Sequence, residues 1–217
     1  MWFFDLYIIL LSIDFFIFLL YNKNKKSSIY KEEIFMNYYV SDLHLGHTNI
    51  MKHSKRPFSS VEEMDETIIK NWNSVVNDED DVYIGGDVFY KGKNPLEYLK
   101  RLKGKKHLCI GNHDGRILKD FNCKKCFVEI KDIMTIKDGD KTIILCHYPM
   151  VEWNGFFRGT LHFYGHIHNN IDNETYKRVY DIQNSYNIGI DILGFYPRTL
   201  NEVIQLNEEF KKKNPIN

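Results

Sequence analysis

The chain has 217 residues, among them 29 basic and 29 acidic side chains, and its formal net charge is zero. A chain of this length can bury a large core, in one large domain or two small ones. The balanced charge argues against a surface that attracts nucleic acid or an anionic membrane over its whole extent. Four scattered cysteines are too few for a disulfide framework, which favours a reduced, cytoplasmic protein.

Residues 1–21 form a hydrophobic segment that is long enough to cross a bilayer as a helix. Asp5 and Asp14 lie within it, and a carboxylate in the middle of a span costs about 2.5 kcal/mol or more. If the segment is a membrane anchor, the lysines of the polar linker, residues 22–35, leave the downstream domain on the cytoplasmic side. The alternative is translation from Met36, or an appended segment without a catalytic role. Both interpretations stay open, and both place the chemistry downstream.

From Met36 onward, apolar runs alternate with helical patterns. The runs at residues 38–40 and 81–84 predict buried strands, each followed by a polar loop. Ser60 to Val76 predicts a helix that begins with a capping box and carries apolar residues at helical spacing. A second helix is expected from Asn94-Pro95 to Gly104, and a strand over residues 107–110 follows it.

The second half of the chain has a different pattern. Residues 127–136 and 142–146 flank Asp138-Gly139-Asp140 and predict a hairpin. Further strands are expected at residues 161–164 and 186–190, and Thr199 with Glu202 begins a C-terminal helix. Because strands and helices alternate early while hairpins dominate late, the sequence predicts an α/β fold with mixed sheets.

The most informative stretch is Gly111-Asn112-His113-Asp114, which follows the predicted strand at residues 107–110. Gly111 can adopt backbone angles that other residues avoid, so the chain can turn sharply there. The turn then presents an amide oxygen, an imidazole and a carboxylate from one loop. A packed core does not need this combination, whereas a cation site with a neighbouring proton donor does.

Other polar side chains follow predicted strands in the same way. Taken singly, each is more often an ordinary turn or surface residue, but together they form a set that suits a metal centre. Two divalent cations about 4 Å apart need around seven protein ligands, one of them shared. The mixture of nitrogen and oxygen favours Mn, Fe, Co or Zn over Mg or Ca. The seven candidate ligands are Asp42, His44, Asp87, Asn112, His147, His166 and His168.

The order of these motifs resembles that of the calcineurin-like metallophosphoesterases, over residues 36 to about 193. The run from Ser41 to His47 looks like a compact bacterial and phage-type branch of that superfamily. The resemblance implies a four-layer β-sandwich with helices on both outer faces, formed by a domain at residues 36–217. It also implies that His113 is the catalytic histidine that protonates the leaving oxygen and that Asp114 is the acidic residue beside it. It divides the ligands into Asp42, His44 and His168 on the first metal and Asn112, His147 and His166 on the second, with Asp87 bridging.

The implied activity is hydrolysis of a small phosphomonoester or phosphodiester that depends on two divalent ions, with Mn expected first. A hydroxide that bridges the ions would attack phosphorus in line, without a covalent enzyme intermediate. A metal-dependent nuclease and a cyclic-nucleotide phosphodiesterase are alternatives, although the charge balance argues against long nucleic acid. A non-catalytic interaction scaffold is a further alternative, against which the complete motif set argues.

Substrate contacts are less clearly marked. An arginine at the pocket can bind a phosphate through two hydrogen bonds, and an aromatic ring can stack on a base. The alternative for the two aromatic residues is that they cover the edge of the sandwich. The candidates are His47, Asn49 and Arg56 in the first loop, and Trp153, Phe156 and Arg158 between His147 and His166.

Overall fold

The computed structural model describes residues 35–90 and 94–216. The chain divides into two units, Met1–Ile34 and Phe35–Asn217, and the fold below is that of the second. Predictions for residues 1–21 and for linker residues 22–34 therefore lie outside the described residues. Within the described ranges, no helix is long and apolar enough to span a membrane.

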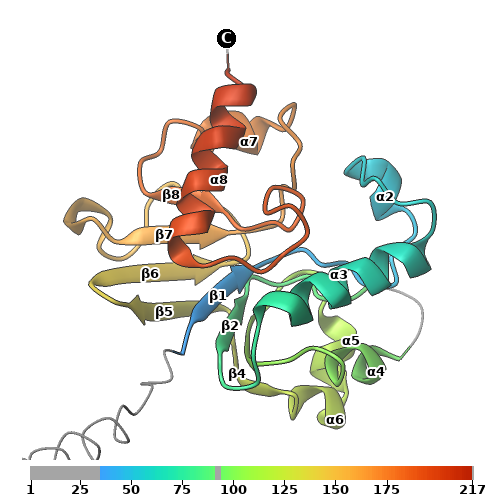
Figure 1. Cartoon of the computed structure of the whole chain (residues 1–217). Helices are drawn as coiled ribbons and strands as arrows, with labels where there is room; N and C mark the ends of the chain where they lie inside the picture. Colours follow the sequence, from blue (N-terminus) through green and yellow to red (C-terminus); the bar gives the residue numbers. More distant parts are fainter. Residues whose placement is uncertain (1–34, 91–93, 217) are drawn as a thin grey trace, which may run out of the picture. The chain divides into compact units, whose positions relative to one another are not determined.

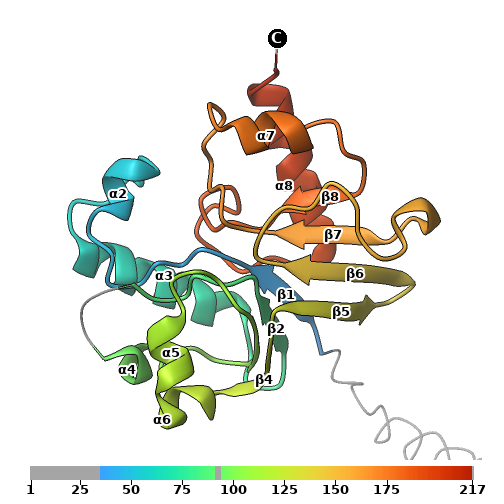
Figure 2. The same cartoon turned by 180° about the vertical axis from the view of Figure 1, so that it is seen from behind.

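The first sheet is entirely parallel. Its strands are β1 (Asn37–Val40), β2 (Asp81–Ile84), β3 (Lys105–Cys109) and β4 (Phe127–Lys131), which pair in that order. Parallel neighbours need crossover connections, and helices supply most of them. These helices are α2 (Ile50–His53), α3 (Val61–Val75), α4 (Pro95–Leu99), α5 (Gly115–Lys119) and α6 (Phe121–Lys124). Figures 1 and 2 show α3 to α6 gathered on one side of this sheet.

The second sheet is mixed. Its strands are β5 (Ile133–Asp138), β6 (Lys141–Cys146), β7 (Leu161–Tyr164) and β8 (Ser185–Asn187), in that order. The pair β5–β6 is an antiparallel hairpin, whereas β6–β7 and β7–β8 are parallel. The remaining elements are the short 3-10 helix η1 (Phe156–Arg158), α7 (Glu174–Val179) and α8 (Leu200–Lys213), with α7 and α8 beside the second sheet (Figure 1). Two sheets flanked by helices confirm the predicted fold class.

The two long helices begin where their caps predict. The Ser60 hydroxyl accepts a hydrogen bond from the Glu63 amide at 3.1 Å, and α3 then buries Met64, Ile68 and Trp72. At the start of α8, the Glu202 carboxylate accepts hydrogen bonds from the Thr199 amide and hydroxyl. Each cap satisfies backbone donors that a helix terminus leaves without partners.

Three details of the prediction are wrong. The expected strand at residues 127–136 is two strands, β4 and β5, which belong to different sheets. Both strands are rich in apolar and β-branched side chains, and no glycine or proline lies between them, so the pattern gave no sign of the break. Hairpins do not dominate the second half, since β6, β7 and β8 are parallel. The helix expected to reach Gly104 ends at Leu99, because the Arg101 carbonyl and the Lys103 amide pair with the side chain of Asn73 on α3 and do not continue the helix.

Two of the three apolar clusters in the described part of the chain hold the sheets and the helices of the first sheet together. One lies between the first sheet and helices α3 to α6, and it includes Leu108, Met64 and Trp72. The other lies between the sheets, where Tyr39 meets Phe163 edge to face at 4.9 Å. At the carboxyl ends of the strands the sheets are joined by backbone hydrogen bonds from Ser41 to Ile188 and from Ile190 to Ser41. Loops from both sheets therefore meet at this edge.

Candidate metal centre

The loops at this edge have an unusual backbone. Eight non-glycine residues among those described have positive φ, a region that side chains with a Cβ avoid. Five of the eight are candidate ligands: Asp42, His44, Asp87, His166 and His168, with φ between 50° and 70°. Such conformations cost of order 1 kcal/mol or more each, and they gather at functional sites that the surrounding fold holds in place.

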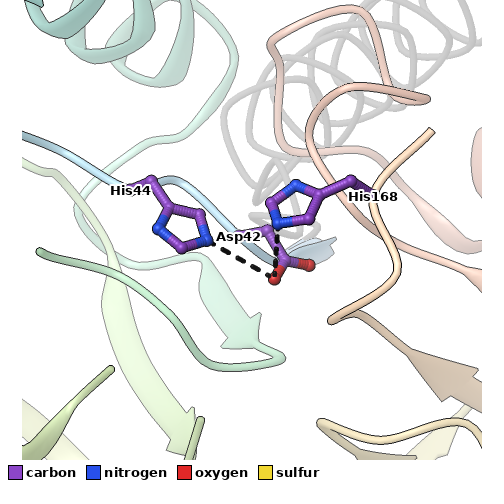
Figure 3. Close-up of side chains that lie close together, drawn as sticks. All are labelled: Asp42, His44 and His168. Carbon is purple, nitrogen blue, oxygen red and sulfur yellow. Dashed lines mark ion pairs between the residues drawn. The ribbon is translucent and has the colours of Figure 1, made fainter. Parts of the chain in front are cut away.

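The first group of donors consists of Asp42, His44 and His168 (Figure 3). The Nε2 atoms of both histidines lie 4.0 Å from Oδ1 of Asp42. That distance is too long for a hydrogen bond. It falls in the range of about 3 to 4 Å expected between atoms that each lie about 2.1 Å from a shared ion. Asp42 and His44 are buried and His168 is half-buried, so the group is partly screened from solvent.

The second group consists of Asp87, Asn112, His147 and His166. The Asn112 side-chain oxygen lies 3.0 Å from His147 Nε2 and 3.0 Å from His166 Nδ1. Asp87, His147 and His166 offer ligand atoms within 4.8 Å of one another. The structure thus brings together all four side chains predicted to serve the second ion and the bridge.

One carboxylate oxygen lies between the two groups. Oδ2 of Asp87 is 3.5 Å from Nε2 of His44, which belongs to the first group. It is 3.6 Å from Nε2 of His147, which belongs to the second. This is the position that a bridging ligand would need.

The unpaired atoms of the site also suit a cation. His44 Nε2 is buried and has no hydrogen-bond partner among the described residues. Burial lowers the pKa of His44 far below its ordinary value, so this imidazole is neutral, and its Nε2 atom lies near the carboxylates of Asp42 and Asp87. Burial and the charge of Asp42 raise the pKa of Asp87, although His147 opposes them. A divalent ion would relieve both effects, so the donor set fits the implied metals.

Hydrogen bonds from the Nδ1 atoms of two of the histidines fix the orientation of their rings. His147 Nδ1 donates to the carbonyl oxygen of Gly85 at 2.7 Å. His168 Nδ1 donates to Oδ2 of Asp191 at 2.9 Å. Because Nδ1 carries the proton in each case, Nε2 is left as the coordinating atom. Asp191 was missed by the sequence analysis, although it directly follows the predicted strand at residues 186–190, as the candidate ligands follow theirs.

Arg56 does not fit its predicted contact with substrate. Its side chain is fully buried, and its guanidinium pairs with Asp191 through Nε at 2.7 Å and Nη2 at 3.1 Å. The same group donates to the backbone carbonyls of Leu43 and Asp42 at 2.8 and 2.7 Å. Arg56 therefore holds the first loop and the partner of His168 in place, with its donors turned toward protein.

His113 and Asp114 have different surroundings. The His113 side chain is 35% exposed and its Nε2 lies 3.9 Å from Asp87 Oδ2, which suits a proton donor at the site. Asp114 is fully buried and accepts hydrogen bonds from the amides of Gly111, Asp87 and Val88. Burial raises its pKa to about 6 in spite of these amides. Asp114 thus ties two loops together, and this placement does not fit a catalytic contact with substrate.

The remaining candidates differ in position. His47 lies at the site, with Nδ1 at 3.2 Å from Nδ1 of His44 and its ring stacked on Tyr90. Asn49 is exposed at the start of α2, where its carbonyl accepts hydrogen bonds from that helix. Arg158 is exposed just before β7, whereas His166 follows the other end of that strand. The structure therefore does not bring Arg158 to the metal ligands.

Trp153 and Phe156 belong to the scaffold. The Trp153 ring is 6% exposed, and its indole nitrogen donates to the carbonyl of Thr160 at 2.9 Å. Phe156 packs edge to face against it at 4.8 Å. Their burial fits the interpretation that these rings cover the edge of the sandwich. It does not fit a stacking contact with a substrate.

Gly111 and Gly165 allow the loops to approach one another. A Cβ at Gly111 would overlap the backbone nitrogen and carboxylate of Asp87. A Cβ at Gly165 would overlap the side chains of Ser41 and Asp42. Any other residue at these two positions would push candidate ligands apart.

Comparison with known proteins agrees with this geometry. The family described as calcineurin-like phosphoesterase matches residues 38–185. An uncharacterized protein of Methanocaldococcus jannaschii, MJ1445, is 36% identical over 183 residues, which cover 83% of this chain and 96% of that protein. The gene 66 protein of Mycobacterium phage L5 is 29% identical over 159 residues, which cover 60% of this chain and 76% of that protein.

A solved structure is also similar. The crystal structure of AQ665, a protein of unknown function from Aquifex aeolicus, aligns with a TM-score of 0.61 and 28% sequence identity. The alignment covers 79% of this chain and 98% of that one. The fold described here is thus shared over nearly the whole length of a compact relative.

Proposed function

Because the chain belongs to the calcineurin-like phosphoesterase family, we propose that it is a hydrolase of small phosphoric esters that uses two divalent metal ions. The observation that carries the proposal is the position of Asp87 Oδ2. That atom lies 3.5 and 3.6 Å from histidine nitrogens of two separate donor groups. A single carboxylate between two such groups is the arrangement that a dinuclear centre needs.

The side chains divide the work of holding the ions. The first ion is assigned to Asp42, His44 and His168, and the second to Asn112, His147 and His166, with Asp87 shared. When bound, the ions would supply positive charge to the phosphoryl oxygens and an activated water. Manganese is our first candidate, with iron, cobalt and zinc as the alternatives that the same nitrogen and oxygen donors suit.

The proton for the leaving oxygen is assigned to His113. Its imidazole is partly exposed, whereas the neighbouring candidate ligands Asp87 and His147 are buried, so it can reach a substrate that enters from solvent. Its backbone amide donates to Asp87 Oδ1 at 2.8 Å, and this bond fixes the loop that carries it. A positioned acid of this kind contributes about 10²–10⁴-fold to rate.

We place the reaction in the cytoplasm. All four cysteines, Cys109, Cys123, Cys126 and Cys146, carry free thiols. Free thiols fit a reducing compartment.

The test uses protein that has been stripped with a chelator and reloaded with Mn, Fe, Co, Zn or Mg in separate samples. p-Nitrophenyl phosphate and bis(p-nitrophenyl) phosphate report monoesterase and diesterase activity. We expect hydrolysis of at least one ester in reloaded samples and none in the stripped sample. Bound ions without hydrolysis of any ester would favour the interaction scaffold, and failure to bind ions would contradict the metal centre itself.

A further inference from the structure

Tyr148 stands out among the large apolar side chains near the site. It directly follows the candidate ligand His147, yet its side chain is 47% exposed. Its ring centroid lies 4.9 Å from that of His147 and 4.7 Å from that of His166, at steep angles to both. An exposed aromatic ring supported by two candidate metal ligands is placed to meet a substrate rather than to fill the core.

The backbone on either side of Tyr148 is fixed. The carbonyl of His147 accepts a hydrogen bond from the Gly165 amide at 2.9 Å. Two residues after Tyr148, the Met150 amide donates to Nε2 of the buried His162 at 3.0 Å. His162 is held in turn by the carbonyl of Ile144. The ring therefore sits on a short anchored segment, which lowers the entropy cost of binding against it.

A second tyrosine near the site, Tyr90, packs against other rings. Tyr90 stacks on His47 with ring centroids 3.7 Å apart and planes 20° apart. It also meets the ring of His113 edge to face at 4.9 Å. Tyr90 thus packs against the proposed proton donor, whereas Tyr148 packs against ligands of the second ion.

These positions separate the two arms of a phosphodiester. The ester oxygen that leaves must lie at His113, since that residue is assigned the proton. We propose that Tyr148 binds a planar ring on the other ester arm, the one that stays on phosphorus. The preferred substrates are then phosphodiesters whose retained group is aromatic or heteroaromatic. This inference rests on the proposed function, because it takes the position of the leaving group from the assignment of His113.

The test compares two diesters with the same leaving group, phenyl p-nitrophenyl phosphate and ethyl p-nitrophenyl phosphate. Stacking of one ring on an aromatic side chain raises the binding affinity by about 5- to 100-fold. We expect Tyr148→Ala to lower kcat/KM for the phenyl ester by that factor, mainly through a higher KM. The same variant should change kcat/KM for the ethyl ester little. Tyr148→Phe should keep the preference, because it keeps the ring.

Phe157→Ala is the matched control. Phe157 is an aromatic residue in the same β6–β7 connection and is 86% exposed, but it lies just before β7, at the end of that strand away from His166. Phe157→Ala should leave kcat/KM for both esters unchanged. A loss in Tyr148→Ala that is equal for the two esters would overturn the proposal, since the ring would then only support His147 and His166. Ion content of each variant, measured by mass spectrometry, shows whether that support is altered.

A binding measurement separates this inference from the proposed function. Calorimetric titration of metal-loaded protein with phenyl phosphate and with ethyl phosphate needs no turnover. A preference for phenyl phosphate that disappears in Tyr148→Ala supports the ring site even if no ester is hydrolysed, and in that case only the hydrolytic function fails. Hydrolysis of both diesters without any phenyl preference would leave the function standing and overturn the ring site. Absence of both binding and hydrolysis would contradict both.

Discussion

The buried pair of Arg56 and Asp191 gives a sharp test of how the site is held together. Both side chains are almost fully buried, and the guanidinium contacts the carboxylate through two nitrogens. Arg56→Met removes one partner of a buried ion pair. The charge of the Asp191 carboxylate is then offset by its hydrogen bond with His168 and no longer by the guanidinium. Removal of one partner of a buried pair costs about 3–5 kcal/mol. For a domain of this size, that corresponds to a fall in Tm of roughly 6–20 °C.

The loss should extend to metal binding. Asp191 orients His168, and Arg56 also holds the carbonyl of Asp42, so two ligands of the first group lose support. Loss of such outer partners typically weakens metal affinity about 10- to 100-fold. Arg56→Lys should fall between wild type and Arg56→Met, because an ammonium cannot reproduce the paired hydrogen bonds.

The assay is urea and thermal unfolding of chelator-treated protein, followed by metal titration. Arg158→Met is the control, since Arg158 is exposed and its side chain makes one long hydrogen bond, 3.4 Å, to Asn154. A surface change of that kind should stay within about 0.5 kcal/mol. If Arg56→Met kept the wild-type Tm and metal affinity but lost kcat/KM, Arg56 would be a substrate contact and the structural role would be refuted.

Three further predictions follow from single contacts. Burial lowers the pKa of His162 to about 4, so the unfolded chain binds its proton first as pH falls. Metal-free wild type should therefore lose up to about 3 kcal/mol more stability than His162→Phe between pH 6.5 and 4, and parallel unfolding curves would contradict this. Protein begun at Met36, whose amide donates to Asp80 at 2.9 Å, should keep the Tm and activity of the full chain, and a loss would assign residues 1–35 a role. His113→Ala should retain its metals yet lose about 10²–10⁴-fold in kcat on esters with poor leaving groups and far less on p-nitrophenyl esters, and equal losses would leave His113 only a positioning role.

The candidate ligands were predictable because each follows an apolar strand in a polar loop. In parallel strands all carboxyl ends point to one edge, so Asp42, Asp87 and Asn112 had to meet if the strands paired. The second sheet brings His147 and His166 to the same edge through β6 and β7. Nothing in the sequence specified which strands pair, but the order of the motifs was enough to identify the group of candidate ligands.

Contacts at long range were not predictable in the same way. Arg56 and Asp191 are 135 residues apart in the chain, and no local pattern links them. An arginine in a polar loop close to the first motif was therefore assigned to substrate binding, whereas its guanidinium is buried and pairs with Asp191. Asp114 presents a similar case, because the sequence places it beside His113 but does not show that its carboxylate accepts hydrogen bonds from the amides of Asp87 and Val88 in the preceding strand's loop.

The prediction of strand boundaries was wrong where strands in two different environments have a similar pattern of apolar residues. Ile130 on β4 packs on the helix side of the first sheet, and Met134 on β5 packs between the sheets. Apolar residues recur through both strands and no glycine or proline separates them, so a single strand at residues 127–136 was the simplest interpretation. Only the pairing of β4 with β3 and of β5 with β6 separates them.

The central claim is that two ions share Asp87, and the ion content of two aspartate variants tests it most directly. Asp80 and Asp87 are both buried and flank opposite ends of β2, so Asp80→Asn is a matched control for Asp87→Asn. After reloading with manganese, mass spectrometry should find close to two ions per chain in wild type and in Asp80→Asn. Asp87→Asn should bind one ion or none and lose its phosphoesterase activity. Two ions and full activity in Asp87→Asn, or a single ion in the wild type, would contradict the dinuclear centre.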